Sequence, residues 1–263
     1  MRVGLIGLGA IGGPVVAAVD GGDIPGVDLA AVLVLRPRPT DPRRLVTSDP
    51  ELFFAEPLDA VLECAGHQAV RDHGVRVLES GADLLMTSAG ALTDSALLER
   101  LLRAAETGKA RLVVPSAGIG ALDILAGAAV GGLSAVTVTV RKDPLSWKGT
   151  EAEATHDLDR LSAPVILYEG PVREGARRYP QNVNISAAAA LAGIGLDRTR
   201  LVIVADPGIS THVVEIEAEG AFGSFRFRED VVPTESNPKT GRLVAMAVIK
   251  SLRQLASRFV VGG

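Results

Sequence analysis

Aromatic residues and cysteine are scarce in this sequence. Phe, Trp and Tyr make up 3% of the 263 residues, so Ala, Val, Leu and Ile must fill the core, which suits helices packed on a buried sheet. The only cysteine, Cys64, cannot form an internal disulfide, and no group of Cys and His residues has the spacing of a zinc site. Cys64 ends an apolar run, so we interpret it as a small buried residue and not as a nucleophile.

An excess of charge and a long apolar run are also missing. Lys and Arg number 27 against 31 Asp and Glu, which argues against a nucleic-acid partner because such proteins need a basic surface. No apolar run approaches the ~18 residues of a membrane span, and the chain opens on a strand-like segment without the features of a secretory signal. We therefore expect no membrane partner and a cytoplasmic location.

The first half of the sequence contains a regular alternation of two patterns. Apolar runs at 3–6, 29–35, 60–62, 83–86 and 110–114 alternate with helical patterns at 11–19, 67–80 and 93–107. Thr93 is the expected N-cap of the last of these helices. Runs that are apolar on both faces are typical of a parallel sheet covered by helices on both sides. The pattern predicts an α/β fold with a Rossmann-type doubly wound sheet.

The second half changes character after Pro115. Apolar and polar residues alternate with period two at 133–140, 211–216 and 221–228, a helical pattern lies at 185–192, and an amphipathic helix extends from 244 to 259. Period two indicates strands with only one buried face. We therefore predict three parts: a Rossmann domain (1–115), an α+β domain with a mixed or antiparallel sheet (116–236), and a C-terminal helix that packs back on the first domain (237–263).

A glycine-rich turn follows the first strand. Its residues are Gly7, Leu8, Gly9, Ala10, Ile11 and Gly12, a G-x-G-x-x-G pattern at the start of the first helix. The first glycine permits a tight turn, the second lets a pyrophosphate approach the backbone, and the third lets the helix close on the strand. The turn predicts a dinucleotide site that involves Gly7, Gly9, Ala10, Ile11 and Gly12, with the phosphates at the helix N-terminus.

The end of the second strand bears on the choice between NAD and NADP. An acidic residue at this position would hold the adenosine ribose of NAD, but the strand ends in Leu35, Arg36, Pro37 and Arg38. The guanidinium of Arg36 can pair with the 2′-phosphate of NADP. A solvated loop arginine is the alternative interpretation. NADP is mildly favoured as the cofactor, and NAD stays open.

Four histidines are available for proton transfer. His67 and His73 lie on the helix after strand 60–62 and suit the cofactor edge or the surface, whereas His156 lies in a charged, solvated segment. His212 differs because it follows a loop and opens a strand, where a rigid scaffold can present an imidazole to a cleft. His212 is therefore the candidate catalytic residue, although position alone does not require that role.

An ordered set of segments along the chain resembles a known family. The segments are 3–12 (VGLIGLGAIG), 63–66 (ECAG), 87–92 (TSAGAL), 114–118 (VPSAG), 141–144 (RKDP), 168–190 (YEGPVREGARRYPQNVNISAAAA), 205–207 (ADP), 219–223 (EGAFG) and 237–240 (NPKT). In this order they resemble the L-aspartate dehydrogenase family over nearly the whole chain. Any one segment alone would not be specific.

The resemblance implies a particular site and assembly. It implies a Rossmann domain joined to a mixed α+β domain that forms the contact of a homodimer, with His212 as the catalytic residue. It also implies that Asn182 and the turn Ser116, Ala117 and Gly118 touch the nicotinamide half of the cofactor. Ala65, in the segment after strand 60–62, is a further candidate cofactor residue.

The reaction implied by the resemblance is an oxidative deamination. Hydride leaves the α-carbon of L-aspartate for nicotinamide, and the resulting imine is hydrolysed to oxaloacetate and ammonia; the family would permit transfer of iminoaspartate to NAD biosynthesis. A base of near-neutral pKa must take a proton, and we hypothesise that His212 does so. Lys142 and Lys239 are candidates for binding the substrate carboxylates, with ordinary surface charges as the alternative.

Three other functions remain open from the sequence. The first is another amino-acid or hydroxy-acid dehydrogenase of the same two-domain plan, and the second is a reductase of the dihydrodipicolinate type, whose paired-histidine segment is not found in this sequence. The third is a non-catalytic module that senses NADP. Binding of the cofactor without turnover of any amino acid would favour the last.

Overall fold

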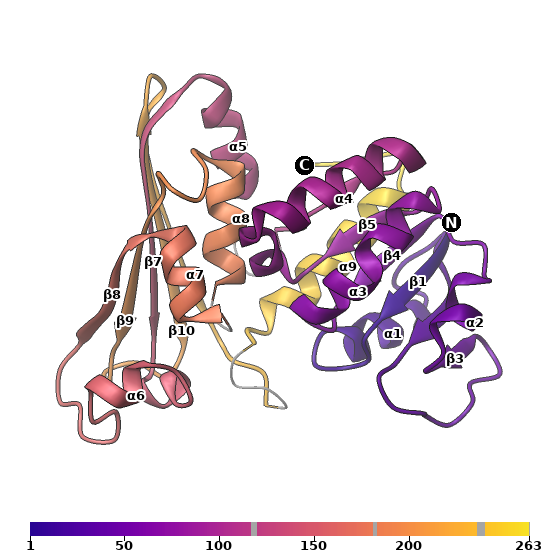
Figure 1. Ribbon diagram of the computed structural model, residues 1–263, viewed down its shortest axis with the longest axis horizontal. Coiled ribbons are helices and arrows are strands. Elements are labelled where there is room, and N and C mark those ends of the chain that lie inside the picture. Colours follow the sequence, from indigo (N-terminus) through magenta and orange to yellow (C-terminus); the bar gives the residue numbers. More distant parts are fainter. Residues whose placement is uncertain (117–119, 181–182, 236–239, 263) are drawn as a thin grey trace. The chain divides into compact units, whose positions relative to one another are not determined.

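The computed structural model describes residues 1–116, 120–180, 183–235 and 240–262. The chain forms two compact units, the first made of Met1–Ala117 with Val244–Gly263 and the second of Gly118–Leu243. The C-terminal segment thus belongs to the same unit as the N-terminal half. Figure 1 shows the elements of both units.

The first unit contains a six-stranded parallel sheet of order β3-β2-β1-β4-β5-β6. Its elements are β1 (Arg2–Ile6), α1 (Gly12–Asp20), β2 (Asp28–Leu33), β3 (Leu45–Thr47), α2 (Pro50–Phe54), β4 (Ala60–Glu63), α3 (His67–Glu79), β5 (Asp83–Met86), η1 (Ala89–Thr93), α4 (Ser95–Gly108), β6 (Leu112–Val113) and α9 (Leu243–Ala256). The strand order reverses between β1 and β4. The carboxyl ends of these two strands form the topological switch point where such sheets bind ligands.

Helices cover both faces of this sheet, as the apolar runs predict. One core cluster joins Val70 and Val77 of α3 and Leu101 of α4 to residues of β1, β2, β4 and β5. The other joins Val15 of α1 and Val248 of α9 to the opposite face of these strands. Figure 1 shows α3 with α4 and α1 with α9 around the sheet. The doubly wound α/β fold is confirmed.

Two local predictions are wrong. Asp94, and not Thr93, is the N-cap of α4, because its side chain accepts hydrogen bonds from the backbone N–H groups of Ala96 and Leu97, both at 3.1 Å. Thr93 instead ends the 3-10 helix η1, which the sequence pattern does not reveal. The C-terminal helix ends at Ala256, so Phe259 is not on its apolar face and is 80% exposed.

The second unit contains a mixed five-stranded sheet of order β11-β10-β7-β9-β8. Its elements are α5 (Leu122–Val130), β7 (Leu133–Lys142), η2 (Pro144–Trp147), α6 (Ala152–Thr155), β8 (Val165–Pro171), α7 (Val172–Arg178), α8 (Asn184–Ala192), β9 (Arg200–Ala205), β10 (His212–Gly220) and β11 (Gly223–Val231). The pair β7 and β9 is parallel, and the other three pairs are antiparallel. The prediction of a second, mixed sheet is confirmed.

One face of this second sheet carries its core. Val138 and Val140 of β7 and Ile216 of β10 alternate with polar residues and pack with α5, α7 and α8 around the buried Trp147. Figure 1 shows these three helices on one side of the sheet. Within the described residues, no helix covers the opposite face. That face carries the polar half of each alternating strand.

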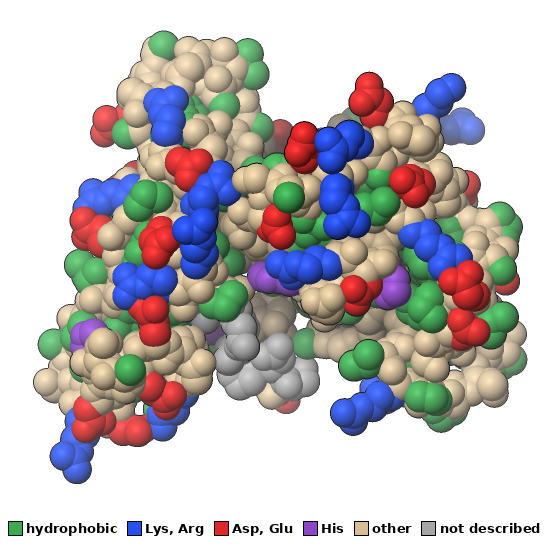
Figure 2. All heavy atoms as spheres, viewed as in Figure 1, with side chains coloured by type: hydrophobic (Ala, Val, Ile, Leu, Met, Phe, Trp, Pro, Cys, Tyr) green, Lys and Arg blue, Asp and Glu red, His purple; other side chains and the backbone are tan. Residues whose placement is uncertain are grey.

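The outer surface mixes both signs of charge. Figure 2 shows Lys and Arg side chains interspersed with Asp and Glu over the visible face of the molecule. In the part of the chain that the structure describes, no helix is long and apolar enough to span a membrane.

Candidate functional site

The glycine-rich turn joins β1 to α1 at the carboxyl edge of the first sheet. Gly7 has a φ of +98°, and a Cβ at this position would lie 2.8 Å from the Cβ of Ala65. A Cβ on Gly12 would clash with the carbonyl oxygen of Gly7. Side chains at either position would therefore force the turn apart. Each of these two glycines meets a steric requirement of the turn.

The same turn leaves room for a ligand. Apart from Gly9 itself and its two chain neighbours, no atom of the described residues lies within 4 Å of the Cβ position of Gly9, so this side of the turn is open. Helix α1 begins at Gly12 without a side-chain cap and without an acidic residue in its first turn. Its N-terminal N–H groups and positive dipole end therefore fit a pyrophosphate. Gly7, Gly9, Ala10, Ile11 and Gly12 form this cradle.

A buried carboxylate beside the turn is the main feature that the sequence analysis missed. Glu63, the last residue of β4, has no exposed surface. Its carboxylate accepts hydrogen bonds from the backbone N–H groups of Ala65 and Gly66, both at 2.7 Å, and from the backbone and hydroxyl of Ser88 at 3.2 and 3.0 Å. Burial raises the pKa of Glu63, and these hydrogen bonds act in the opposite direction. An acidic residue inside an apolar strand is the signal that could have revealed it.

The neighbouring Cys64 thiol is unsuited to nucleophilic chemistry. Burial raises its pKa well above the ordinary value, and the charge of Glu63 adds to this effect. A thiol in such surroundings stays protonated near neutral pH. Its backbone N–H continues the β1–β4 ladder by donating to the carbonyl of Ile6 at 2.8 Å. Cys64 is a structural residue at the edge of the cofactor cradle.

The loop after β2 presents cationic and apolar side chains. Leu35 is 95% exposed, and Arg36 and Arg38 are exposed beside it. The nearest acid along the loop, Asp41, binds Arg43 through a backbone N–H at 3.0 Å and a side-chain Nε at 3.1 Å. These bonds lower the pKa of Asp41. No acidic residue precedes Asp41 in this loop, so its exposed side chains before Asp41 include the cations Arg36 and Arg38 and no carboxylate.

In the second unit, His212 and Lys142 are buried on one sheet face. His212 opens β10 and is 6% exposed, and Lys142 ends β7 and is 4% exposed. The strands are antiparallel, with Val213 opposite Arg141, so Lys142 and His212 lie on facing positions one residue further along. Alternation places both side chains on the helix-covered face of the sheet. The ammonium group of Lys142 lies 5.7 Å from the ring centroid of Trp147.

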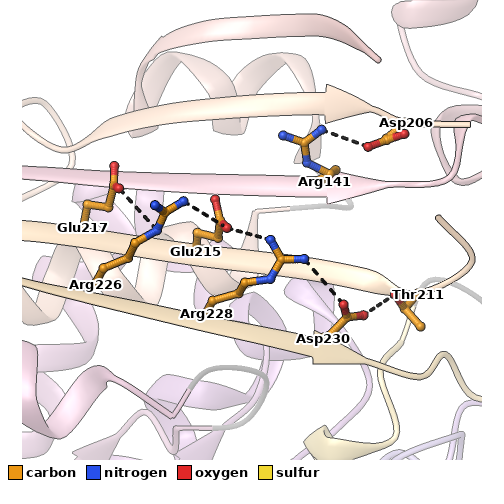
Figure 3. Close-up of polar contacts among 8 residues, drawn as sticks. All are labelled: Arg141, Asp206, Thr211, Glu215, Glu217, Arg226, Arg228 and Asp230. Atoms are coloured by element: carbon orange, nitrogen blue, oxygen red, sulfur yellow. Dashed lines mark hydrogen bonds and ion pairs between the residues drawn. The ribbon is translucent and has the colours of Figure 1, made fainter. Parts of the chain in front are cut away.

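An ion pair on the opposite face supports the loop that leads to His212. The Asp206 carboxylate accepts hydrogen bonds from the backbone N–H of Gly208 at 2.8 Å and from Arg141 Nη1 at 2.9 Å. These bonds, the Gly208 bond foremost, hold the pKa of Asp206 below its ordinary value. The backbone N–H of Asp206 also donates to the carbonyl of Lys142 at 2.9 Å. The loop start is thereby tied to the end of β7 (Figure 3).

The remaining candidate residues lie elsewhere in the structure or outside the described ranges. Ser116 follows β6 and is half-buried, whereas Ala117, Gly118, Asn182 and Lys239 lie outside the described residues. His156 is on a loop after α6, where its Nδ1 lies 2.8 Å from the hydroxyl of Thr155. Burial lowers the pKa of His73, whose ring lies 6.0 Å from that of Phe54. His73 is thus packed against Phe54 of α2.

Family profiles match both units. A profile described as homoserine dehydrogenase, NAD binding domain, matches residues 7–115, and one described as aspartate dehydrogenase, C-terminal, matches residues 123–255. With the doubly wound sheet and its open glycine-rich turn, these matches define a two-domain dehydrogenase that uses a nicotinamide cofactor. More particularly, the chain belongs to the L-aspartate dehydrogenase family, as its relatives show.

Three relatives carry the name L-aspartate dehydrogenase. The protein of Ruegeria pomeroyi is 42% identical over 97% of this chain and 92% of its own length. That of Pseudomonas aeruginosa is 39% identical over 96% of each chain. That of Methanosarcina acetivorans is 33% identical over 100% of this chain and 99% of its own. The similarity therefore extends over both units.

Solved structures share the fold at lower sequence identity. A crystal structure of aspartate dehydrogenase from Thermotoga maritima has a TM-score of 0.79 and 24% identity, and the match covers 100% of this chain and 99% of that chain. A dihydrodipicolinate reductase from Paenisporosarcina has a TM-score of 0.54 and 18% identity over 97% of this chain and 94% of that chain. Both support the two-domain architecture.

Proposed function

We propose that this protein catalyses the NAD(P)-dependent oxidative deamination of L-aspartate to iminoaspartate, which is hydrolysed to oxaloacetate and ammonia, or the reverse reductive amination. The observation that carries the proposal is that Lys142 and His212 are both buried on one sheet face. The chain also matches relatives named L-aspartate dehydrogenase along nearly its whole length. The pair combines a fixed cation with a proton-accepting imidazole.

Each side chain has a defined task in this reaction. When bound, the nicotinamide ring accepts the hydride that leaves the α-carbon of the substrate. His212 first takes one proton from the α-ammonium group, because the nitrogen needs a free lone pair to form the imine. His212 then releases this proton to solvent, so that in the hydrolysis half its neutral imidazole takes a proton from the attacking water and returns it to the departing nitrogen. The ammonium group of Lys142 binds a substrate carboxylate, and Lys239 is proposed for the other.

The cofactor residues are proposed on the same basis. Gly7, Gly9, Ala10, Ile11 and Gly12 hold the pyrophosphate, and Ala65, Ser116, Ala117, Gly118 and Asn182 contact the remainder of the cofactor. Arg36 favours NADP, because its exposed guanidinium follows β2 in a loop where no acid is available to the ribose. We infer a cytoplasmic location for the reaction, because a chain with a single cysteine suits a reducing compartment.

A parallel assay tests the function. Reduction of NAD and of NADP is followed at alkaline pH with L-aspartate, L-glutamate, L-alanine and L-malate as substrates. Aspartate is expected to give the highest kcat/KM. Faster turnover of a neutral amino acid or of malate would favour another dehydrogenase of the same plan, and cofactor binding without any turnover would favour a sensing module.

Substitution of Arg36 tests the cofactor choice. Arg36→Ala is expected to raise the KM for NADP about tenfold, the size of one lost ionic hydrogen bond, and to change the KM for NAD by less than about twofold. Arg160→Ala, which removes an 86% exposed arginine in the second unit, serves as the control. Equal effects on both cofactors would contradict the assignment of Arg36 to the 2′-phosphate.

A homodimer that forms through the uncovered face of the second sheet completes the proposal. On this face Glu215 pairs with Arg226 at 3.3 Å and with Arg228 at 2.9 Å, and the alternating charges continue to Glu217 and Asp230 (Figure 3). Because these charges are paired within the chain, a second copy can approach without strong net repulsion. Ile166, 56% exposed on β8, adds apolar surface to this face.

A further inference from the structure

Glu63 links three strands at the carboxyl edge of the first sheet. It ends β4, pairs in register with Ile6 of β1 and Met86 of β5, and is completely buried. No lysine, arginine or histidine of the described residues forms an ion pair with it. A buried carboxylate without a salt-bridge partner is costly, so its hydrogen bonds must compensate.

The hydrogen bonds of Glu63 join two loops that are far apart in sequence. The carboxylate accepts hydrogen bonds from the N–H groups of Ala65 and Gly66 in the turn before α3. It also accepts hydrogen bonds from the N–H and hydroxyl of Ser88 before η1. The main-chain carbonyl of Glu63 receives the N–H and hydroxyl of Thr87, both at 3.1 Å. Six donors from two loops thus converge on one residue.

These loops lie against the cofactor cradle. The Ala65 backbone is so close to Gly7 that a Cβ on Gly7 would lie 2.9 Å from the Ala65 nitrogen, the same nitrogen that donates to Glu63. Gly66 has a φ of +118° and caps α3, so the turn has an unusual backbone that the carboxylate stabilises. Loss of these hydrogen bonds would therefore leave Ala65 and Gly66, which lie against the glycine-rich turn, without their support.

We propose that Glu63 is a positioning residue for the nicotinamide cofactor, which holds the turn 64–66 and the start of η1 in the arrangement that receives the nucleotide. Its carboxylate accepts hydrogen bonds from the N–H groups of Ala65 and Gly66, so these donors are not available to a phosphate. The N–H groups at the start of α1 have no such side-chain partner. The network thereby leaves α1 as the anion site and shapes the neighbouring wall.

Substitution of Glu63 by glutamine provides the test. Gln has nearly the same shape, but its NH2 group cannot accept hydrogen bonds. Oε1 accepts from Ala65, Gly66 and the Ser88 hydroxyl and Oε2 from the Ser88 N–H, so at least the Ser88 N–H loses its acceptor and faces a second donor. The dissociation constant for NADPH and for NADH, measured by nucleotide fluorescence, is expected to rise about tenfold or more in Glu63→Gln. At saturating cofactor, kcat is expected to stay within about threefold of the wild type.

Two further variants separate positioning from general stability. Ser88→Ala removes one of the four bonds to the carboxylate and is expected to raise the dissociation constant about two- to threefold. Asp83→Asn disrupts the bonds of another carboxylate to Arg111, at the amino end of β5. It is expected to lower Tm without a change in nucleotide affinity. A Glu63→Gln enzyme that loses Tm but binds nucleotide as tightly as the wild type would overturn the proposal.

A measurement on the wild type covers the case in which Glu63→Gln does not fold. Hydrogen exchange of the amides of Ala65, Gly66 and Ser88 is expected to be slow in the free enzyme, because Glu63 already engages them. Fast exchange that becomes slow only with NADPH would overturn the proposal. Neither readout requires turnover, so a failure to oxidise aspartate would refute the proposed function and leave the Glu63 comparison valid.

Discussion

At the scale of single residues, the proposed reaction depends on His212 for its proton transfers. It opens β10, is almost completely buried, and lies on the face that also carries Lys142. Because alanine can neither accept nor return the protons of the proposed reaction, His212→Ala is expected to lower kcat by at least about 100-fold while the dissociation constant for NADPH changes less than about twofold. Stopped-flow and steady-state assays with aspartate measure the loss.

A matched control uses another histidine of the same unit. His156→Ala removes an imidazole from the loop after α6, where it contacts Thr155, and is expected to leave kcat unchanged. If both variants keep wild-type turnover, His212 is not the acid–base residue of the reaction.

Glu229 makes the stability of the protein depend on pH. Burial raises its pKa from the ordinary 4.5 to about 7. The folded state therefore binds more protons than the unfolded state between these two values, and stability falls as pH rises from about 4.5 to about 7. Glu229→Gln is expected to be more stable than the wild type at pH 8, by about 1–2 kcal/mol once solvent screening of a partly exposed group is allowed for. The difference is expected to vanish near pH 4.5.

Urea unfolding at pH 5 and pH 8 measures this effect. Glu235→Gln is the control, because the Glu235 side chain is 92% exposed and its ion pair with Arg242 lies in solvent. A stability difference for Glu229→Gln that does not change between the two pH values would show that Glu229 titrates normally.

At the scale of elements, the start of α4 depends on one side chain. The Asp94 carboxylate accepts the N–H groups of Ala96 and Leu97, which otherwise have no partner within the helix. Asp94→Ala is expected to reduce the free energy of unfolding by about 1 kcal/mol, whereas Asp94→Asn keeps a capping oxygen and is expected to cost much less. Thermal unfolding of the two variants side by side measures this, and equal losses would contradict the capping role.

The element scale also shows which patterns were sufficient in the sequence. The long periodic segments predicted α3, α4 and β7 with their ends wrong by only a few residues. The sequence analysis missed β9, because its unbroken apolar run lacks the period-two alternation that marks the other predicted strands of the second unit. The three-residue strand β3 and the short helix α2 gave no periodic signal at all.

At the scale of the whole molecule, the proposed dimer predicts how the protein behaves at different concentrations. Ile166→Glu places an unpaired charge on the uncovered sheet face and is expected to shift the protein from dimer to monomer. Leu52→Glu, at a similarly exposed position in α2, is expected to leave the dimer intact. Light scattering after size-exclusion chromatography measures the mass of both variants. A wild-type monomer at all concentrations tested would refute the dimer.

What the sequence determined by itself is local. The glycine-rich turn, the doubly wound class and the mixed second sheet follow from residues that are neighbours along the chain, because turn geometry and hydrophobic periodicity need no distant partner. The tertiary structure alone decided that Glu63 accepts a hydrogen bond from Ser88, which is 25 residues away in the sequence. It also decided that Lys142 and His212 occupy facing positions on adjacent strands. Strand order and register set these contacts, and both depend on how distant segments pair when they bury their apolar faces.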